Sequence, residues 1–400
     1  MLLSGLIGLV KISVYAKLLT PIEFGYYSLS LLLSTYGMYI CSCGLYEGSM
    51  GLFPRWYGEG RSKDVESSRN KIAGFTVISS LALSICIGIL LASNILPDMS
   101  TGIAILMAGL FAGVSTLFLL LLADIRSRLM TFEFGIIMFL RSILSIFLGT
   151  LLARKYGYVG ILGSEIFITG FITAIIARHT IHNFSWNFSE FLALKPIFRV
   201  GLPLMLNGFV TSAASNIDRF FVISKWGSTI FGYYSFAMIL ATGASLIQSI
   251  LYQQISPEIL YRIGRGDSPN KLLANLNRFI IIIFVFLVLF GYPFAVMIKW
   301  LIYNYFPEYL PAYSMIPIIY VGASVIIVSH YEYFIVAVGK TEYLLVLNIF
   351  VVTVVLLLSV LCSFLELSLI SFASIYVIGR ILYFISTFLL SRWAVNKLCA

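Results

Sequence analysis

The sequence predicts an all-α, polytopic membrane protein with about twelve membrane-spanning helices in two six-helix bundles. Three observations carry this prediction. The chain is 60% hydrophobic and 11% charged with a mean hydropathy of +0.99, whereas soluble domains carry about 25% charged residues. Its apolar runs are about 20 residues long, the length of a helix that crosses a bilayer. Finally, a short motif recurs half a chain apart.

Lipid must solvate most of such a chain, and this solvent restricts the backbone. Every N–H and C=O inside a bilayer needs a partner within the protein, so only helices and closed barrels span it. Barrel strands would alternate apolar and polar residues, but the apolar runs here are continuous. Helices are therefore expected throughout. The sequence has no signal-peptide cleavage site, so the first run is expected to remain as a helix.

The spanning helices are expected at the apolar runs, to within a few residues at each end. In chain order, these runs are 1–19, 25–46, 72–95, 102–123, 132–153, 158–178, 200–223, 229–253, 278–300, 314–338, 343–363 and 368–391. The stretches 278–291 and 349–361 are almost unbroken apolar sequence. The ninth and eleventh helices are therefore expected to face lipid along much of their length.

The positive charges orient the helices. If both termini are cytoplasmic, the inside connections and the C-terminal tail hold 17 lysines and arginines, and the outside connections hold five. Short loops rich in lysine and arginine stay on the cytoplasmic side, so this bias predicts that both termini are cytoplasmic. The net charge of +9 is scattered over short loops, not gathered in a basic domain with interleaved aromatic residues. Nucleic acid is therefore not an expected partner.

An internal repeat divides the chain. The pentapeptide Phe-Gly-Tyr-Tyr-Ser at 24–28 recurs at 231–235, an offset of 207 residues. Both copies open the second helix of a half, and charged loops follow at 54–71 and 256–278. Six helices separate the copies, so both halves insert in the same orientation, as in the parallel repeats of some transporters. The expected parts are an N-terminal bundle at 1–178, a cytoplasmic connector at 179–199 and a C-terminal bundle at 200–400.

Ionisable side chains within spans are costly in lipid and usually face a bundle interior or a wet cavity. The cations inside the predicted helices are Lys11, Arg141, Arg219 and Arg380. The acids are Asp218, Glu165 and Glu332. We expect the cations to line a substrate cavity and the acids to serve ion coupling or charge balance, with Asp218 the first candidate for coupling. The alternative is that Asp218 is the structural partner of a cation on another helix.

Asp218 and Arg219 are adjacent in sequence, which places them about 100° apart around a helix. They therefore do not face each other, and we expect one to face the cavity while the other reaches a neighbouring helix. Glu47, Glu133 and Asp124 lie near predicted helix ends. For these three acids, a position at the level of the lipid headgroups is as well supported as one in the cavity.

Polar side chains recur along one face of several predicted helices. On 25–46, Thr35, Tyr39 and Ser42 follow at spacings of 4 and 3, which is one helical face. Similar stripes are formed by Asn207, Thr211 and Ser215 in the seventh helix and by Thr242 and Ser249 in the eighth. The stripes predict a polar cavity between the halves. The alternative is that these hydroxyls bond neighbouring helices to one another.

The sequence offers no enzyme motif. It has no nucleotide-binding glycine loop, no His/Cys metal cluster and no serine elbow. A membrane glycosyltransferase or polymerase would need a large outward loop with paired acids or arginines, and none is present. We therefore expect no catalytic residue, no metal site and no cofactor other than a coupling H⁺ or Na⁺.

Several short motifs occur in a set order. Residues 17–28 have the sequence KLLTPIEFGYYS, Gly-Leu-Pro at 201–203 opens the seventh helix, Asp-Arg at 218–219 lies late in it, and Gly-Tyr-Tyr-Ser at 232–235 opens the eighth. In this order and over the whole chain, the sequence resembles the bacterial polysaccharide flippases, the Wzx-type O-antigen transporters. Their superfamily also contains the multidrug and toxic-compound extrusion proteins.

The resemblance implies transfer of an undecaprenyl-diphosphate-linked oligosaccharide from the cytoplasmic to the periplasmic leaflet of the bacterial inner membrane. The oligosaccharide would be an O-antigen or a similar repeat unit of a surface polysaccharide. The resemblance also implies alternating access driven by an H⁺ or Na⁺ gradient. The partners would be membrane lipids and other polysaccharide-assembly proteins. The alternatives are an ion-coupled drug exporter of the same superfamily, against which the intramembrane cations argue, and a membrane glycosyltransferase or polymerase, which is less favoured.

Overall fold

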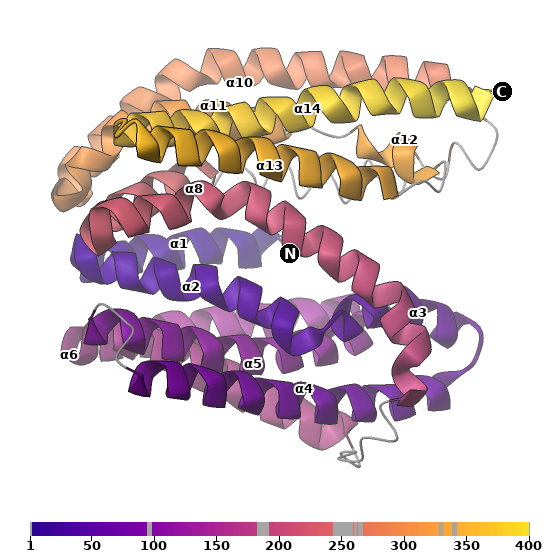
Figure 1. The fold of residues 1–400 in the computed structure, drawn as a ribbon. Helices are drawn as coiled ribbons and strands as arrows, with labels where there is room; N and C mark the ends of the chain where they lie inside the picture. Colours follow the sequence, from indigo (N-terminus) through magenta and orange to yellow (C-terminus); the bar gives the residue numbers. More distant parts are fainter. Residues whose placement is uncertain are drawn as a thin grey trace. The chain divides into compact units, whose positions relative to one another are not determined.

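The computed structural model describes residues 2–93, 98–181, 192–242, 259, 262, 267–327, 331–337 and 342–399. The first half comprises α1 (Leu2–Leu18), α2 (Pro21–Ser42), α3 (Leu45–Gly58), α4 (Ser62–Ala92), α5 (Met99–Ser127) and α6 (Thr131–Thr180). The second comprises η1 (Leu192–Leu194), α8 (Lys195–Thr242), α10 (Pro269–Tyr305), η2 (Pro307–Ser314), α11 (Ile316–Ile327), α12 (Glu332–Ala337), α13 (Glu342–Phe364) and α14 (Leu369–Cys399). Each of the twelve predicted spans has a described helix at its position, so the all-α prediction is confirmed (Figure 1).

The helices α6 and α8 each contain two predicted spans. They have 50 and 48 residues, and straight helices of that length would measure about 75 and 72 Å. The hydrocarbon core of a bilayer is only about 30 Å thick. Gly157 (φ 55°) interrupts α6, and Gly227 (φ 74°) interrupts α8. Glycine adopts such positive φ angles without strain, so a single residue joins two spans at each break.

By length and hydropathy, seven described helices are able to cross a membrane, or eight if the bent pair α2 and α3 forms one span. Because α6 and α8 are each broken, these two helices supply four spans. The helices α1 and α11 have 17 and 12 residues and are shorter than the roughly 20 residues of a complete membrane-spanning helix. Each of them nevertheless lies within a predicted apolar run.

The segment 54–71, predicted to be a loop, is mostly helical. Cys43 (φ 46°) and Gly44 (φ 85°) turn the backbone at the end of α2, and α3 follows at an angle of 67°. Leu45 and Phe53 lie two turns apart on α3 and are both buried in the core of unit 1. On the opposite face of α3, Gly51, Pro54 and Gly58 are exposed. A search for continuous apolar runs therefore overlooks this amphipathic helix.

Three further predictions fall partly on residues that are not described. The predicted span 314–338 corresponds to two helices, α11 and α12, and 328–330 between them lie outside the described residues. Most of the predicted loop 256–278 also lies outside them, although α10 already begins at Pro269. The predicted connector 179–199 includes 182–191, which are likewise outside.

The chain divides into two compact units, Leu3–Phe209 (unit 1) and Val210–Ala400 (unit 2). In unit 1, α5 packs against α2, α4 and α6, whose ribbons run alongside it (Figure 1). In unit 2, α14 packs against α11, α12 and α13. The first turns of α8 belong to unit 1 and the remainder to unit 2. The predicted boundaries of the N-terminal bundle at 178 and of the C-terminal bundle at 200 stay predictions.

The helices α10 and α13 turn large apolar side chains outward. Ile281, Phe286 and Leu289 on α10 and Leu357 on α13 are each more than 60% exposed. Side chains of this kind are stable at a surface when lipid is the solvent. Their exposure agrees with the predicted lipid-facing stretches 278–291 and 349–361.

Candidate functional site

The charges predicted inside the spans gather in two groups. The unit 1 cluster consists of Lys11, Arg141 and Glu165, and the unit 2 cluster consists of Asp218, Arg219 and Arg380. Each cluster draws on helices that are distant in sequence. The structure therefore brings together within each unit charges that the sequence identified only one by one.

An ion pair forms the centre of the unit 1 cluster. Lys11 Nζ on α1 donates a 2.6 Å hydrogen bond to Glu165 Oε1 on the second half of α6. The side chains are 14% and 1% exposed, respectively. The other carboxylate oxygen, Oε2, is buried and accepts no hydrogen bond from the part of the chain that the structure describes. Glu165 therefore has one oxygen available for another ligand or a proton.

Arg141 and two tyrosines surround this ion pair. The Arg141 guanidinium lies 5.1 Å from the centre of the Phe118 ring and within electrostatic range of Glu165. Its Nε is buried and has no partner within the described ranges. Tyr15 and Tyr27 meet edge to face, with 5.7 Å between their ring centres. Both rings are almost completely buried. The polar groups thus lie in a rigid aromatic frame.

The unit 2 cluster is centred on Asp218, which is 1% exposed. The Tyr234 hydroxyl donates a short hydrogen bond to Asp218 Oδ2, so the acid reaches the helical segment that follows the Gly227 break. Arg219 and Arg380 lie within electrostatic range of this carboxylate. The Arg380 guanidinium stacks 4.9 Å from the centre of the Tyr376 ring. Arg219 Nε is buried, and no described residue is its hydrogen-bond partner.

The two clusters occupy related places in the internal repeat, with their charges exchanged. Lys11 and Asp218 are 207 residues apart, as are Tyr27 and Tyr234. In unit 1 the first helix carries the cation and the last carries the acid Glu165. In unit 2 the first helix carries the acid and the last carries the cation Arg380. Each cluster has two cations and one carboxylate, and therefore a surplus of one positive charge.

The two buried tyrosines were not among the predicted site residues, although a signal for them was present. Tyr27 and Tyr234 are the fourth residues of the two pentapeptide copies. They are 1% and 0% exposed. A polar side chain that recurs at the repeat offset and is buried in both halves is a natural partner for a buried charge.

The predicted polar stripes are placed in several ways. Thr35 and Ser215 donate their hydroxyls to carbonyls one turn earlier in their own helices, at 3.1 and 2.8 Å. Ser42 is 2% exposed and donates to Glu47 at 3.1 Å. The Tyr39 ring packs 6.0 Å from that of Phe209. The remaining stripe residues are Asn207 and Thr211, which also make polar contacts, Thr242, whose side chain is not described, and Ser249, which lies outside the described residues.

Glu332 lies apart from both clusters in its contacts. It begins α12, and its Oε2 accepts a 2.7 Å hydrogen bond from the Tyr383 hydroxyl on α14. Glu133, at the start of α6, is exposed, which fits a position at the level of the headgroups. The structure shows which contacts the described residues among these candidates make. Their roles in a substrate cavity and in ion coupling stay predictions.

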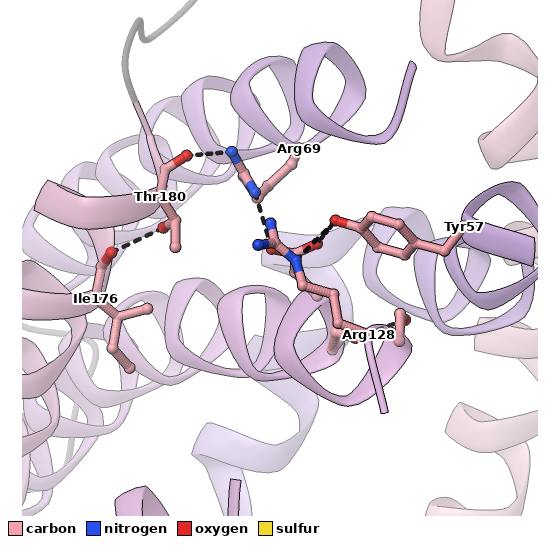
Figure 2. A network of polar contacts seen from close by, with 8 residues as sticks. Tyr57, Arg69, Arg128, Ile176 and Thr180 are labelled. Carbon is pink, nitrogen blue, oxygen red and sulfur yellow. Dashed lines mark hydrogen bonds and ion pairs between the residues drawn. The ribbon is translucent and has the colours of Figure 1, made fainter. Parts of the chain in front are cut away.

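A third polar group, which the sequence did not predict, lies at the end of unit 1 that is predicted to be cytoplasmic (Figure 2). Asp124 accepts hydrogen bonds from Arg69 and Arg128 at 2.8 Å and from the Tyr57 hydroxyl at 2.5 Å. Arg69 also donates to the Thr180 carbonyl. We call these residues the Asp124 network. It ties α3, α4, α5 and the end of α6 together.

The Asp124 network corrects one prediction. Arg69, counted among the cations of the predicted loop 54–71, lies within α4 and is 2% exposed. Asp124, which lies near the end of a predicted span, is 0% exposed. Burial, together with the hydrogen bond to Asp124 and its charge, raises the pKa of Tyr57 to about 12. The phenol therefore stays protonated at neutral pH and acts as a donor.

Solved structures share this fold. A multidrug resistance MATE family transporter of the MOP superfamily, in an inward-facing conformation, has 17% sequence identity and a TM-score of 0.63, covering 99% of this chain and 95% of that one. The lipid II flippase MurJ in an inward closed conformation has 17% identity and a TM-score of 0.73, covering 99% and 88%. A MOP transporter from Pyrococcus furiosus, described as having a binding pocket of reverse polarity, has 17% identity and a TM-score of 0.62, covering 98% and 96%.

At these identities the likeness concerns the fold, which is that of MOP-superfamily transporters. No curated protein matches the chain in sequence. A family described as "Polysaccharide biosynthesis protein" matches residues 14–260, more than half of the 400 residues. The matched region includes the pentapeptide repeat, the unit 1 ion pair partner Glu165 and the Asp218–Arg219 motif. The chain therefore belongs to this family of polysaccharide biosynthesis proteins.

Proposed function

We propose that the protein is a flippase that moves an undecaprenyl-diphosphate-linked oligosaccharide from the cytoplasmic to the periplasmic leaflet by alternating access. The oligosaccharide would be an O-antigen or a similar repeat unit of a surface polysaccharide. Family membership supports a role in polysaccharide synthesis, and the fold supports transport. The observation that carries the proposal is the surplus of one positive charge in each of the two clusters.

A diphosphate fits this surplus. It is a dianion at neutral pH, and an isolated cation in a membrane costs several kcal/mol unless it meets water, an acid or an anionic ligand. Arg141 and Arg219 each keep a buried Nε that has no hydrogen-bond partner among the described residues. The planar guanidinium forms paired hydrogen bonds to phosphate oxygens. Each of these arginines is therefore a proposed ligand for phosphate oxygens of the diphosphate, with Lys11 and Arg380 balancing charge within their own clusters.

Coupling to an H⁺ or Na⁺ gradient is assigned to the buried carboxylates, with Asp218 first and Glu165 and Glu332 next. An acid whose protonation differs between inward and outward states shifts the equilibrium between them. Asp218→Asn should leave the protein inserted but slow net transport under a gradient. Glu133→Gln, which alters an exposed acid at the start of α6, is the matched control. Normal gradient-driven transport by Asp218→Asn would assign Asp218 to structure alone.

The test of the flippase proposal uses purified protein in liposomes with a fluorescent lipid-linked oligosaccharide. The fraction of label that becomes accessible to a membrane-impermeant quencher should increase with time, and the Arg141→Ala/Arg219→Ala double variant should abolish the increase. A protein that leaves this lipid in place but extrudes a cationic dye would instead be the drug exporter that is the alternative within the superfamily.

A further inference from the structure

A groove on the outer surface of unit 1 is separate from both charge clusters. It has a volume of about 470 Å³ and runs between α5 and α6. Val114 and Leu117 of α5 form one wall, and Gly170, Ala174 and Ala177 of α6 form the other. The wall from α6 is low because these three side chains are small or absent. The groove is therefore apolar and open at the surface of unit 1.

The groove has the length of one lipid leaflet. From Gly170 to Ile181, its ends on α6, the helix rises about 16 Å. The hydrocarbon core of a bilayer is about 30 Å thick, so the groove extends across about half of it. This length fits one acyl chain that lies along the helices within a single leaflet.

Arg178 lies at the end of the groove near the C-terminus of α6. Its side chain is exposed, and among the described residues it has no hydrogen bond or ion pair. No described acidic side chain lines the groove. An arginine beside an apolar groove at this depth is complementary to a lipid that carries a phosphate at the same level.

The Asp124 network fixes this end of the groove. Arg69 donates to the carbonyl of Thr180, and the Thr180 hydroxyl donates to the Ile176 carbonyl at 2.8 Å (Figure 2). The last carbonyls of a helix have no partner within the helix, and here a buried arginine bonded to Asp124 supplies one. The last turn of α6, which carries Arg178, is therefore held in place.

We propose that this groove binds an anionic phospholipid from the leaflet on the Arg178 side, which the charge bias predicts to be cytoplasmic. One acyl chain lies along Ala174 and Ala177, and the phosphate binds the Arg178 guanidinium. Unit 2 also has an apolar groove, of about 360 Å³, between α10 and α11, but among the described residues no charged side chain lines it. Selectivity for an anionic headgroup is therefore assigned to the unit 1 groove.

The test compares phospholipid headgroups on purified full-length protein in detergent. Phosphatidylglycerol at a concentration ten times its Kd should raise the thermal unfolding midpoint by about 2 °C, and phosphatidylcholine at the same concentration should raise it by less. Arg178→Gln should remove this difference. Ala174→Leu, which fills the groove at an exposed position, should weaken binding of both lipids. Arg126→Gln removes an exposed cation near the end of α5, outside the groove, and should leave the difference intact.

Two outcomes would overturn the proposal. The first is that Arg178→Gln retains the full preference for phosphatidylglycerol, which would place anionic-lipid selectivity elsewhere on the molecule. The second is that a polyprenyl diphosphate displaces phosphatidylglycerol from the native protein at equal concentration, which would assign the groove to the carrier lipid of the proposed substrate. Both measurements report binding alone, so they hold whether or not the protein transports glycan.

Discussion

Lys11 and Asp218 stand at equivalent places in the two halves of the sequence and carry opposite charges. Lys11 meets the acid Glu165, whereas Asp218 meets a tyrosine hydroxyl and two arginines. A buried charge is stable only when its surroundings compensate for it. The two halves therefore carry charges of opposite sign at this position of the repeat. In both halves the charged side chain has a polar or charged partner inside the protein.

The ion pair between Lys11 and Glu165 leads to a prediction about stability. Lys11→Met leaves the Glu165 carboxylate buried without its cation, and breaking a buried pair in this way costs roughly 3–5 kcal/mol. The double variant Lys11→Met/Glu165→Met should recover most of the loss, because neither charge then remains buried. Unfolding in mixed micelles would measure both. Lys155→Met, at an exposed lysine of α6, serves as the control and should unfold like the native protein.

A double variant as unstable as Lys11→Met alone would contradict this prediction. It would mean that Lys11 contributes through packing and that the ion pair has little part in the stability of unit 1. Transport should be lost in the double variant even where stability returns, since the surplus of positive charge remains but the carboxylate does not.

Arg219 leads to a prediction about transport. Arg219→Ala should abolish export of lipid-linked glycan, and Arg219→Lys should retain part of it, because a lysine keeps the charge but not the planar fork. Lipid-linked oligosaccharide on the cytoplasmic leaflet and the amount of inserted protein are measured together. Arg154→Ala, at an exposed arginine of α6, is the matched control. Undiminished surface glycan in a fully inserted Arg219→Ala variant would show that the residue is structural.

At the scale of elements, glycines let α8 approach the junction of α2 and α3 closely. A Cβ atom on Gly44 would lie 2.8 Å from the backbone of Gly201 and Leu202, and one on Gly201 would meet the Gly44 carbonyl. Gly48 similarly faces the main chain at Ile197. The obstacle is backbone in each case, so no side-chain rotation relieves it.

The close contact of α8 with the junction of α2 and α3 predicts opposite effects on stability for two glycine-to-alanine substitutions. Gly201→Ala should destabilise the protein by about 1–3 kcal/mol, the usual effect of overpacking. Gly163→Ala has no heavy atom within 4 Å of the new Cβ and should be neutral or stabilising by up to about 1 kcal/mol, since alanine favours a helix interior over glycine. Thermal unfolding of the two variants beside the native protein measures the difference. Equal midpoints for the two would refute the close approach.

At the scale of the whole molecule, hydropathy predicted the spans because it averages over about 20 residues. It even separated the spans within α6 and α8 to within a few residues of Gly157 and Gly227. It overlooked α3, a helix of 14 residues whose buried apolar side chains lie on one face only. An average of hydropathy along the chain does not detect such an amphipathic helix, because it does not separate the two faces.

The candidate site was predictable as a set of residues but not as a set of pairs. The sequence identified Lys11 and Glu165 as intramembrane charges, but 154 positions separate them, and only the packing of α1 against α6 brings them together. The Asp124 network was overlooked for a similar reason, since Arg69 lies 55 positions away from Asp124. Its one local signal is Arg128, four residues after Asp124 at the end of an apolar run.

The charge bias leads to a prediction about orientation. In a background without the five native cysteines, single cysteines at Gly60 and Gly266 should be shielded from an impermeant thiol reagent added outside the cell. Cysteines at Pro97 and Pro307 should react with it. The controls are the same variants in permeabilised cells, where all four should be labelled. External labelling at position 60 or 266 would reverse the predicted topology.

The breaks at Gly157 and Gly227 also determine what the predicted outward face offers to other molecules. Each joins two spans through a single residue, and a side chain at 157 would collide with Glu23. Proteases need several residues of extended chain to bind, and the residues on both sides of these glycines are helical. Cleavage at either connection would therefore have to begin with the unwinding of a helix end.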